Sequence, residues 1–498
     1  TDGTALTISV YGKGGTGGNY AQFSPYLRDY SAWYHIIVAV DTTQATQSNR
    51  AKAYINGVQI TNTVANGFSL SYTFTYLNST SGHLIGKNNE GGGPVYTDTY
   101  FAEYNFIDGQ QLTASSFGAY DTNGIWQPVK YSGTYGTNGF YLPFSNTTST
   151  TTLVQDSSGN GNNWTPNNIS LTAGTTYDSM IDSPTVSAMA SNYCVLNPVW
   201  TESGYTNATM TNGNLTASSP TNTSVYSFGT LGVSTGKWYW EYTVVNVPSV
   251  GTLYLGLAQI SPVSGTYVRA YRHDTGEYYN GTAWAAYGAT YTTNDVIGVA
   301  LDLDNQTLTF YKNNVSQGQK TSIGLTGITV FPEIYSNYSP GSATANFGQR
   351  PFTYTPPTGY NTLNTYNLPT PTIANGALYN AATLWTGNGT SQSIVNSQSN
   401  GGNNPLGKTF YSDFVWAKIT GTTGNHSNYD SVRGAQQWLS TNLTNAEGTY
   451  PGVTAFNSNG FTIGSDGGVN TNGAAYVGWQ WNAGSGSSSS NKIGRAHV

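Results

Sequence analysis

The chain has 498 residues, of which 8% are charged and 14% aromatic, and glycine alone contributes 60 residues. The formal net charge of −6 offers no basic patch for nucleic acid, and no run of about 18 apolar residues is present to span a membrane. The single cysteine, Cys194, excludes an internal disulfide framework. The aromatic residues supply ample surface to bury, so we expect a folded, mostly β protein of about three domains, at roughly 150 residues per domain.

The first expected domain covers residues 1–118. Two runs rich in β-branched and aromatic residues, WYHIIVAVD at 33–41 and AKAYINGVQI at 51–60, predict two strands. Asn56 and Gly57 lie inside the second run and tolerate positive φ, which predicts a tight turn. The pattern resembles the concanavalin A-like, laminin-G-like jelly roll. Most of its N-terminal strands are missing from the sequence, so we expect a truncated domain.

Residues 119–191 are rich in Gly, Asn and Thr, a composition typical of a connector. The end of the first domain and this connector contain a series of short words: FIDG at 106–109, SSFG at 115–118, IWQPVKY at 125–131, GTNGFYL at 136–142 and DSSGNGNNWT at 156–165. Together these words resemble a block that follows such a jelly roll in virion proteins of tailed phages. The resemblance implies an ordered connector and a particle component rather than a metabolic enzyme.

The second expected domain covers residues 192–352. The stretch from Val296 predicts a buried strand, Asp304 and Asn305 a turn, and residues 306–311 an antiparallel return. Four segments of this domain carry a family pattern: GVSTGKWYWEYTV at 232–244, LYLGLAQ at 253–259, NDVIGVALDLDNQTLTFYKNN at 294–314 and VFPEIYS at 330–336. In order and spacing they resemble the SPRY (B30.2-like) β-sandwich.

Three proline residues near position 353 predict a boundary, because proline interrupts sheet pairing, and residues 353–372 are expected to form a linker. FVWAKIT at 414–420 and AAYVGWQWNAG at 474–484 resemble a second phage-associated, concanavalin A-like module over residues 373–484. Residues 485–498 are expected to be a Gly/Ser linker and the tail KIGRAHV, which matches a translated sequencing adapter. The expected fold class is therefore all-β, with tandem β-sandwiches: a jelly roll, a SPRY sandwich and a second jelly-roll-like module.

Patterns that would indicate catalysis or zinc binding are weak. Residues 232–236 satisfy G-x-S-x-G, but a nucleophile elbow needs a helix after the serine, and a strand is expected here. Glu103 and Asp108 are five residues apart and would face opposite sides of a strand, which argues against a glycosidase pair. The histidines lie at no zinc-ligand spacing. We therefore expect no enzyme activity.

A calcium site is conceivable in the oxygen-rich segment 156–162, where Asp156, Asn160 and Asn162 are the candidate ligands. Asx and Ser side chains in glycine-rich loops more often bond their own backbone, so a turn is favoured over calcium, and no cofactor is expected.

The densest group of aromatic and polar residues lies at 271–287. Such side chains can stack on sugar rings or anchor a protein partner at small entropic cost. The alternative, which the SPRY resemblance favours, is that alternate aromatic residues of these strands face the core. The candidate ligand-binding residues are Tyr271, Arg272, His273, Tyr279, Trp284 and Tyr287.

The combined resemblances imply a virion protein of the tail-fibre or adhesin kind, located in the extracellular particle. Its modules would bind a host-surface glycan or protein receptor, and other virion proteins and further copies of the chain would be partners. Nucleic acid and membrane insertion are not expected. A structural fibre-shaft or capsid-decoration protein without a ligand is the main alternative, and a polysaccharide depolymerase is a weaker one, because no carboxylate pair is found.

Overall fold

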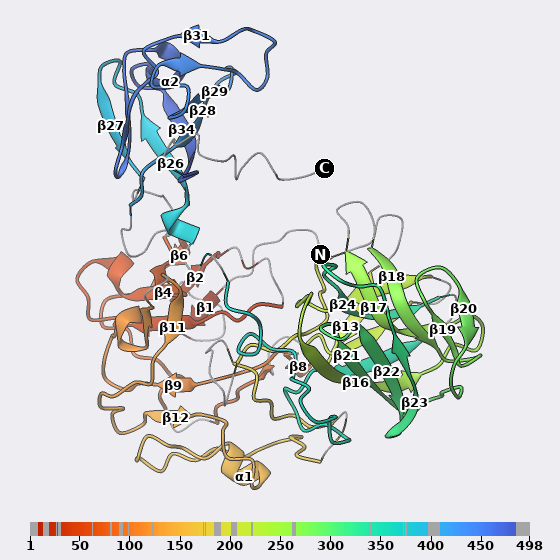
Figure 1. The fold of residues 1–498 in the computed structure, drawn as a ribbon. Coiled ribbons are helices and arrows are strands. Elements are labelled where there is room, and N and C mark those ends of the chain that lie inside the picture. Colours follow the sequence, from red (N-terminus) through yellow and green to blue (C-terminus); the bar gives the residue numbers. More distant parts are fainter. Residues whose placement is uncertain are drawn as a thin grey trace. The chain divides into compact units, whose positions relative to one another are not determined.

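The structure is a computed structural model. It describes residues 8–484 except 13–18, 26, 28–30, 62, 80–81, 89–92, 98, 122–123, 173, 175, 184–190, 201–206, 221–222, 261–264, 338–339, 372, 374–375 and 397–408. The expected tail at 485–498 therefore lies outside the described residues. Strands dominate these residues and the two α-helices among them are single turns, which confirms the all-β class (Figure 1). The described helices include none that is long and apolar enough to cross a membrane.

Two compact units make up the chain, one of residues 1–117 and 128–369, the other of residues 118–127 and 370–498. The N-terminal strands of the first unit belong to two small sheets: β1 (Ile8–Tyr11), β2 (Tyr20–Phe23) and β6 (Thr63–Asn66) in one, β3 (Ile36–Val40), β4 (Ala51–Ile55) and β5 (Val58–Gln59) in the other. The predicted strand pair is confirmed, because β3 and β4 run antiparallel with Ile36 opposite Ile55. Asn56 and Gly57 form the predicted turn with φ of 46° and 83°.

Within the expected connector, strand β12 (Phe140–Leu142) pairs with a strand of the preceding segment. Phe106 of β9 (Tyr104–Phe106) lies opposite Phe140 of β12, and their rings stack with centroids 5.5 Å apart. The other short elements before residue 200 are η1 (Gln47–Asn49), β7 (Lys87–Asn88), β8 (Val95–Tyr96), η2 (Ala114–Ser116), β10 (Gly118–Tyr120), β11 (Trp126–Pro128) and α1 (Thr150–Leu153).

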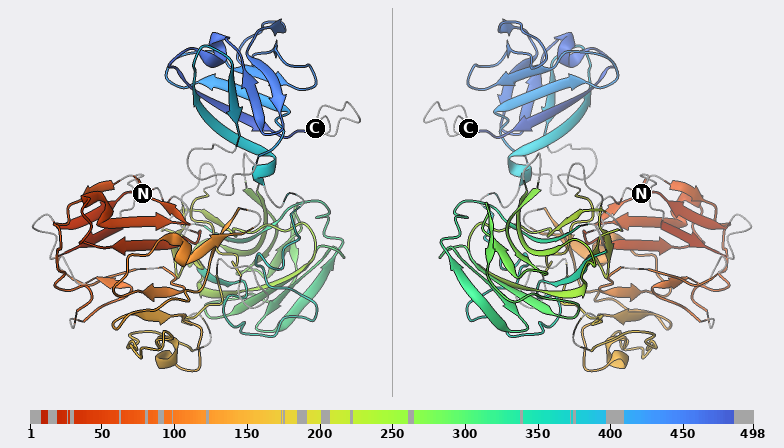
Figure 2. Two further views of the ribbon diagram at one scale, coloured as in Figure 1. Left: turned by 90° about the vertical axis from the view of Figure 1, so that its left-hand side faces the viewer. Right: turned by 90° about the vertical axis from the view of Figure 1, so that its right-hand side faces the viewer.

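The largest part is a sandwich of two antiparallel sheets, here called the central sandwich (Figures 1 and 2, green). Its seven-stranded sheet contains, in spatial order, β13 (Thr209–Thr211), β14 (Thr216–Ser218), β25 (Ser342–Asn346), β16 (Lys237–Asn246), β21 (Val296–Asp302), β22 (Thr307–Lys312) and β23 (Val315–Thr321). Its six-stranded sheet contains β15 (Val225–Phe228), β24 (Phe331–Ser336), β17 (Leu253–Ile260), β18 (Gly265–Arg272), β19 (Glu277–Tyr279) and β20 (Trp284–Ala286). The predicted hairpin is confirmed, with Asp302 of β21 opposite Thr307 of β22.

Strand β16 is buried on both faces. Trp238 and Trp240, two residues apart, are 2% and 0% exposed and belong to the core of the central sandwich, as period-two spacing predicts. On the opposite face, the carboxylate of Glu241 accepts hydrogen bonds from the backbone N–H groups of Thr353 and Tyr354 at 2.8 and 2.9 Å. The segment that composition predicts as a linker therefore packs on the sandwich before the chain leaves it.

The C-terminal module is a second, smaller sandwich (Figure 2, blue). Its four-stranded sheet contains β26 (Asn380–Thr386), β34 (Ala475–Trp481), β28 (Phe414–Ile419) and β29 (Ser427–Asp430). Its three-stranded sheet contains β27 (Gln392–Val395), β33 (Gly460–Ile463) and β32 (Val453–Asn457). Four short elements complete the module: η3 (Gly376–Leu378), β30 (Gln437–Trp438), β31 (Gly448–Thr449) and α2 (Gly467–Asn470). The module has a hydrophobic core of its own, in which Val415, Tyr429, Phe461 and Tyr476 are fully buried.

One buried carboxyl group joins distant parts of the first unit. Asp182 is 8% exposed and accepts hydrogen bonds from the backbone N–H of Tyr193 at 2.9 Å and from the side chain of Trp33. Burial raises the pKa of this carboxyl to about 6 despite these bonds. In the folded chain, burial therefore disfavours the ionised form of Asp182 relative to the protonated form.

The buried position of the two tryptophans leads to a stability prediction. Trp238→Ala and Trp240→Ala are each expected to lower the free energy of unfolding by about 3–5 kcal/mol, because truncation leaves a cavity. Cys194, the chain's single cysteine, is fully buried in the same core, so its alkylation rate during urea unfolding reports on this sandwich alone. Val315→Ala on the edge strand is the control, since Val315 is 64% exposed. Unchanged alkylation in both tryptophan variants would contradict the core assignment.

The raised pKa of Asp182 predicts a pH dependence. Because the folded-state pKa of about 6 lies above the ordinary value of 3.8, the folded chain binds more protons between these values, and the contribution of Asp182 to stability is lost as pH rises from about 4 to 6. Asp182→Asn removes this loss. We expect the difference in melting temperature between the Asp182→Asn variant and the wild type to increase by about 5 °C or more in favour of the variant between about pH 4 and 6. Above this range the difference should stay constant. A difference independent of pH would contradict the shift.

Candidate functional site

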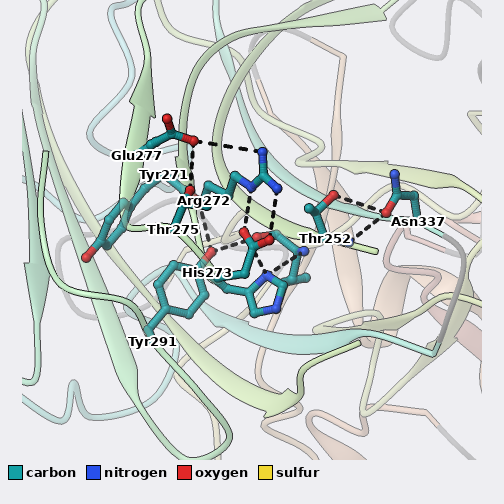
Figure 3. Close-up of polar contacts among 10 residues, drawn as sticks. Thr252, Tyr271, Arg272, His273, Thr275, Glu277, Tyr291 and Asn337 are labelled. Atoms are coloured by element: carbon teal, nitrogen blue, oxygen red, sulfur yellow. Dashed lines mark hydrogen bonds and ion pairs between the residues drawn. The ribbon is translucent and has the colours of Figure 1, made fainter. Parts of the chain in front are cut away.

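Strand β18 divides the predicted ligand-binding residues between the two faces of the six-stranded sheet. Successive side chains of a strand point to opposite faces, so Tyr271 points to the core and Arg272 to the outside. His273 and Tyr287 join Tyr271 on the inner side, whereas Tyr279 and Trp284 join Arg272 on the outer side. In Figure 3 the Arg272 guanidinium lies beside Glu277, while the ring of Tyr271 points away from it.

The inner three residues are engaged in the protein's own structure. Tyr271 is fully buried, and its hydroxyl donates to the carbonyl of Ala289. His273 is 6% exposed, and its Nδ1 accepts a hydrogen bond from the backbone N–H of Leu253 at 3.0 Å, while burial lowers its pKa (Figure 3). The hydroxyl of Tyr287 donates to the carbonyl of Gly318 at 2.5 Å and accepts from the N–H of Phe310 at 3.1 Å. The prediction that a ligand contacts Tyr271 is therefore wrong, because the side chain lies inside the core.

The outer three residues lie together. The guanidinium carbon of Arg272 lies 6.0 Å from the centroid of the Trp284 ring, within the range of a cation–π contact. The Trp284 ring lies 5.2 Å from the ring of Tyr279 and 4.8 Å from that of Tyr254, which the sequence did not single out. All except Tyr254 are half-buried. This is the part of the predicted cluster that a ligand could reach.

Aromatic rings continue across the same face of the sheet. Tyr254 lies 5.0 Å from Tyr335, Tyr335 lies 4.5 Å from Tyr226, and Tyr226 lies 6.0 Å from Phe228, centroid to centroid. The register explains the row, because Tyr226 is directly opposite Tyr335, and Tyr335 is directly opposite Tyr254. The outer aromatic row is the name we give to Tyr226, Tyr335, Tyr254, Trp284 and Tyr279. Phe228 lies at its end but outside it, because its side chain is 1% exposed and packs against the ring of Trp200.

The residues that sequence reasoning missed carry a local signal. In VYSF at 225–228, LYL at 253–255 and IYS at 334–336, a tyrosine follows a core aliphatic residue, which is the alternation of a strand with two apolar faces. No local pattern states that these three strands are neighbours. The row therefore depends on strand order, in which β15, β24 and β17 are adjacent although they are far apart in the chain.

A small ionic group closes one end of the row. Arg272 makes a two-pronged ion pair with Asp274, with N–O distances of 2.5 and 2.8 Å, and lies 3.9 Å from Glu277 (Figure 3). Hydrogen bonding to Arg272 lowers the pKa of Asp274 despite the partial burial of that carboxyl. Glu277 also accepts a hydrogen bond from the hydroxyl of Thr275 at 2.8 Å. The positive charge of Arg272 is thus more than balanced by Asp274 and Glu277, and this ionic group carries one net negative charge at the end of the row.

The G-x-S-x-G segment lacks the setting of a nucleophile. Ser234 is exposed in a bend, and the chain continues into strand β16 rather than into a helix. Glu103 accepts a hydrogen bond from the hydroxyl of Tyr141, and Asp108 accepts one from the side chain of Asn78 at 2.7 Å, so both carboxylates serve the scaffold. Among the described residues, no group of three or more His, Cys, Asp or Glu side chains lies close enough to hold a metal ion.

The oxygen-rich loop forms the hydrogen bonds of a turn. Asp156 accepts from the backbone N–H groups of Tyr141, Ser158 and Asn162 at 2.8–2.9 Å. The side-chain amides of Asn160 and Asn162 both donate to the carbonyl of Gly139, at 2.8 and 2.9 Å. These are the hydrogen bonds expected of a turn, in which Asx side chains bond to nearby backbone groups.

Comparison with known proteins identifies two segments. A family model described as SPRY domain matches residues 237–350. The predicted presence of a SPRY domain is confirmed over these residues. A model described as a domain of unknown function, DUF7483, matches residues 375–497. The chain is also similar to the solved SPRY domain of human HERC1, at 18% identity over 30% of this chain and 96% of that chain, with a TM-score of 0.26.

Two further solved structures are similar over the same share of the chain. One is a human SPRY domain, at 20% identity over 29% of this chain and 97% of that chain, with a TM-score of 0.24. The other is stonustoxin, at 19% identity over 31% of this chain and 27% of that chain, with a TM-score of 0.25.

The division of the cluster predicts losses of stability of different size for two variants. Tyr287→Phe removes a hydroxyl with two internal hydrogen bonds and should lower the free energy of unfolding by about 1–2 kcal/mol. Arg272→Gln breaks a partly exposed ion pair and should cost less than about 1 kcal/mol. Urea unfolding followed by Cys194 alkylation measures both. A larger loss for Arg272→Gln than for Tyr287→Phe would reverse the assignment of inner and outer residues.

Proposed function

We propose that this protein is a non-enzymatic interaction protein and that the outer aromatic row, with Arg272 at its end, is a recognition surface of its SPRY segment. The supporting observation is the continuous row of aromatic rings on the sheet face opposite the core, where half-buried Tyr226, Tyr279 and Trp284 border nearly buried Tyr254 and Tyr335. Rigid aromatic side chains bury a large area at small entropic cost, which suits them to anchor a partner.

The low charge of the surface indicates how binding operates. Arg272 is paired with Asp274 and Glu277, so its positive charge is not free to attract a partner, and we expect the row to bind by stacking, apolar contact and hydrogen bonding. Host-surface glycans and protein receptors both satisfy these requirements.

We further propose that the chain acts as an adhesion component of a tailed-phage virion, of the tail-fibre kind. The support is the series of words at 106–165 that resemble virion proteins, together with the tandem β-sandwich architecture. In this setting the chain is part of an extracellular particle and assembles with other virion proteins and with copies of itself.

Two rivals predict different results. A fibre-shaft or capsid-decoration protein would bind no cell surface, and a polysaccharide depolymerase would release reducing sugars from host polysaccharide. The polysaccharide depolymerase has little support. Glu103 and Asp108 are hydrogen-bonded to Tyr141 and Asn78, respectively, and do not form a catalytic carboxylate pair.

The proposal predicts cell-surface binding that depends on the row. Fluorescently labelled full-length chain should bind at least one strain of a bacterial panel in flow cytometry, and Trp284→Ala should weaken binding about tenfold, since aromatic anchors carry much of an interface's energy. Tyr366→Ala is the matched control, because Tyr366 is 52% exposed and lies outside the row. Binding should change little between about 0.05 and 0.5 M NaCl, because stacking and apolar contacts, unlike exposed charge pairs, are not screened by salt.

Three outcomes would count against the proposal. Absence of binding to every strain favours the structural rival, and release of reducing sugars favours the depolymerase. A steep loss of binding with salt would show that charged residues, rather than the row, carry the interaction.

A further inference from the structure

The C-terminal module carries a second aromatic surface, on the outer face of its four-stranded sheet. Phe414 of β28 is directly opposite Trp481 of β34, and Trp416 is directly opposite Trp479. Because directly opposed residues of neighbouring strands share a face, the four rings form one group. We call these four residues the tryptophan face.

Burial along both strands shows that the tryptophan face is the outer one. The alternate residues Val415, Ala417 and Tyr476 are fully buried in the module's core, whereas the four aromatic residues are half-buried. The face continues onto β26, where Leu384 is 46% exposed. An ordinary solvent-facing strand would carry polar residues at these positions.

The rings lie close enough to form one platform. The centroids of Trp416 and Trp479 are 5.5 Å apart with their planes at 54°, and those of Phe414 and Trp481 are 5.3 Å apart with their planes at 51°, so the platform is angled rather than flat. The indole N–H of Trp416 donates to Nδ1 of His426 at 2.8 Å, which fixes the orientation of that ring. Among the described residues, the indole N–H groups of Trp479 and Trp481 have no hydrogen-bond acceptor, so both can donate to a ligand.

Charge on and around the platform is small. Lys418 lies on the same side of β28, and its ammonium group donates to the carbonyl of Ile419 at 3.0 Å. Asp430, at the edge of the sheet, is paired with Arg433 at 2.6 Å. Lys418 keeps its positive charge, but the face consists mainly of aromatic and apolar side chains, so stacking rather than ion pairing is the contact that it offers a ligand.

The size of the platform favours a small ligand over a protein. Neighbouring strands are about 4.8 Å apart and same-face residues about 6.8 Å apart, so three strands with three outer positions each cover roughly 300 Å² including the side chains. A stable protein interface buries about 800 Å² on each partner. Tryptophan instead combines a large, rigid apolar ring with an N–H donor, and these two features suit the apolar faces and the hydroxyl groups of sugar units.

We propose that the tryptophan face is a binding site for a neutral polysaccharide, separate from the SPRY surface and independent of its role. Trp416 and Trp479 stack on the sugar rings, and Trp479 and Trp481 donate hydrogen bonds to hydroxyl oxygens.

The test is native affinity electrophoresis of the full chain in gels that contain dextran, mannan, galactomannan or mixed-linkage β-glucan. At least one of these neutral polysaccharides should retard the protein. Trp416→Ala and Trp479→Ala should each weaken this binding about tenfold, whereas Trp479→Phe, which keeps a ring but loses the N–H, should weaken it less. High salt should leave the retardation unchanged.

Tyr450→Ala is the matched control, because Tyr450 is a 47% exposed aromatic residue of the same module outside the face. Thermal melts check that each variant is folded. The proposal is overturned if no neutral polysaccharide retards the chain, if only an anionic polysaccharide or a protein binds, or if folded Trp416→Ala and Trp479→Ala variants bind like the wild type. Because the gels contain polysaccharide alone, such a failure leaves the cell-binding proposal for the SPRY surface untouched.

Discussion

The central sandwich depends on a strand that is packed on both faces. Through Trp238 and Trp240, β16 fills the core between the sheets, and through Glu241 it holds the backbone of residues 353–354 on its other side. It also pairs with β21 and β25, which places it in the middle of the larger sheet. A chain with so few charges has little scope for surface ion-pair networks, so aromatic packing and backbone hydrogen bonds to a few buried carboxylates provide the stability.

Both sandwiches use the same device to create candidate binding surfaces. Each has a sheet whose inner face forms the core and whose outer face carries aromatic residues in place of polar ones. In the SPRY segment an ion pair closes the end of the row, and in the C-terminal module the platform contains two indole donors that the described residues do not use. The two faces differ in size and polarity, which is why we assign them to different kinds of ligand.

The motifs with possible chemical meaning are explained by local bonding. Asp156 satisfies backbone N–H groups in its loop, and Glu103 and Asp108 serve the scaffold. The nucleophile-like Ser234 precedes a strand. In each case a short polar pattern is common in a sequence rich in Gly, Asn, Ser and Thr, because such residues bond readily to nearby backbone.

The sequence alone determined the all-β class, the hairpin turn at Asn56 and Gly57, the burial of Trp238 and Trp240, and the SPRY segment, because these features follow from local alternation, turn chemistry and ordered short patterns. It grouped Tyr271 with Trp284 because they are near in the chain, although the sheet separates them. Only the tertiary structure decided that Tyr226, Tyr335 and Tyr254 adjoin Trp284, and that Trp416 meets Trp479. Strand order and register are set by long-range pairing, which no short stretch of sequence encodes.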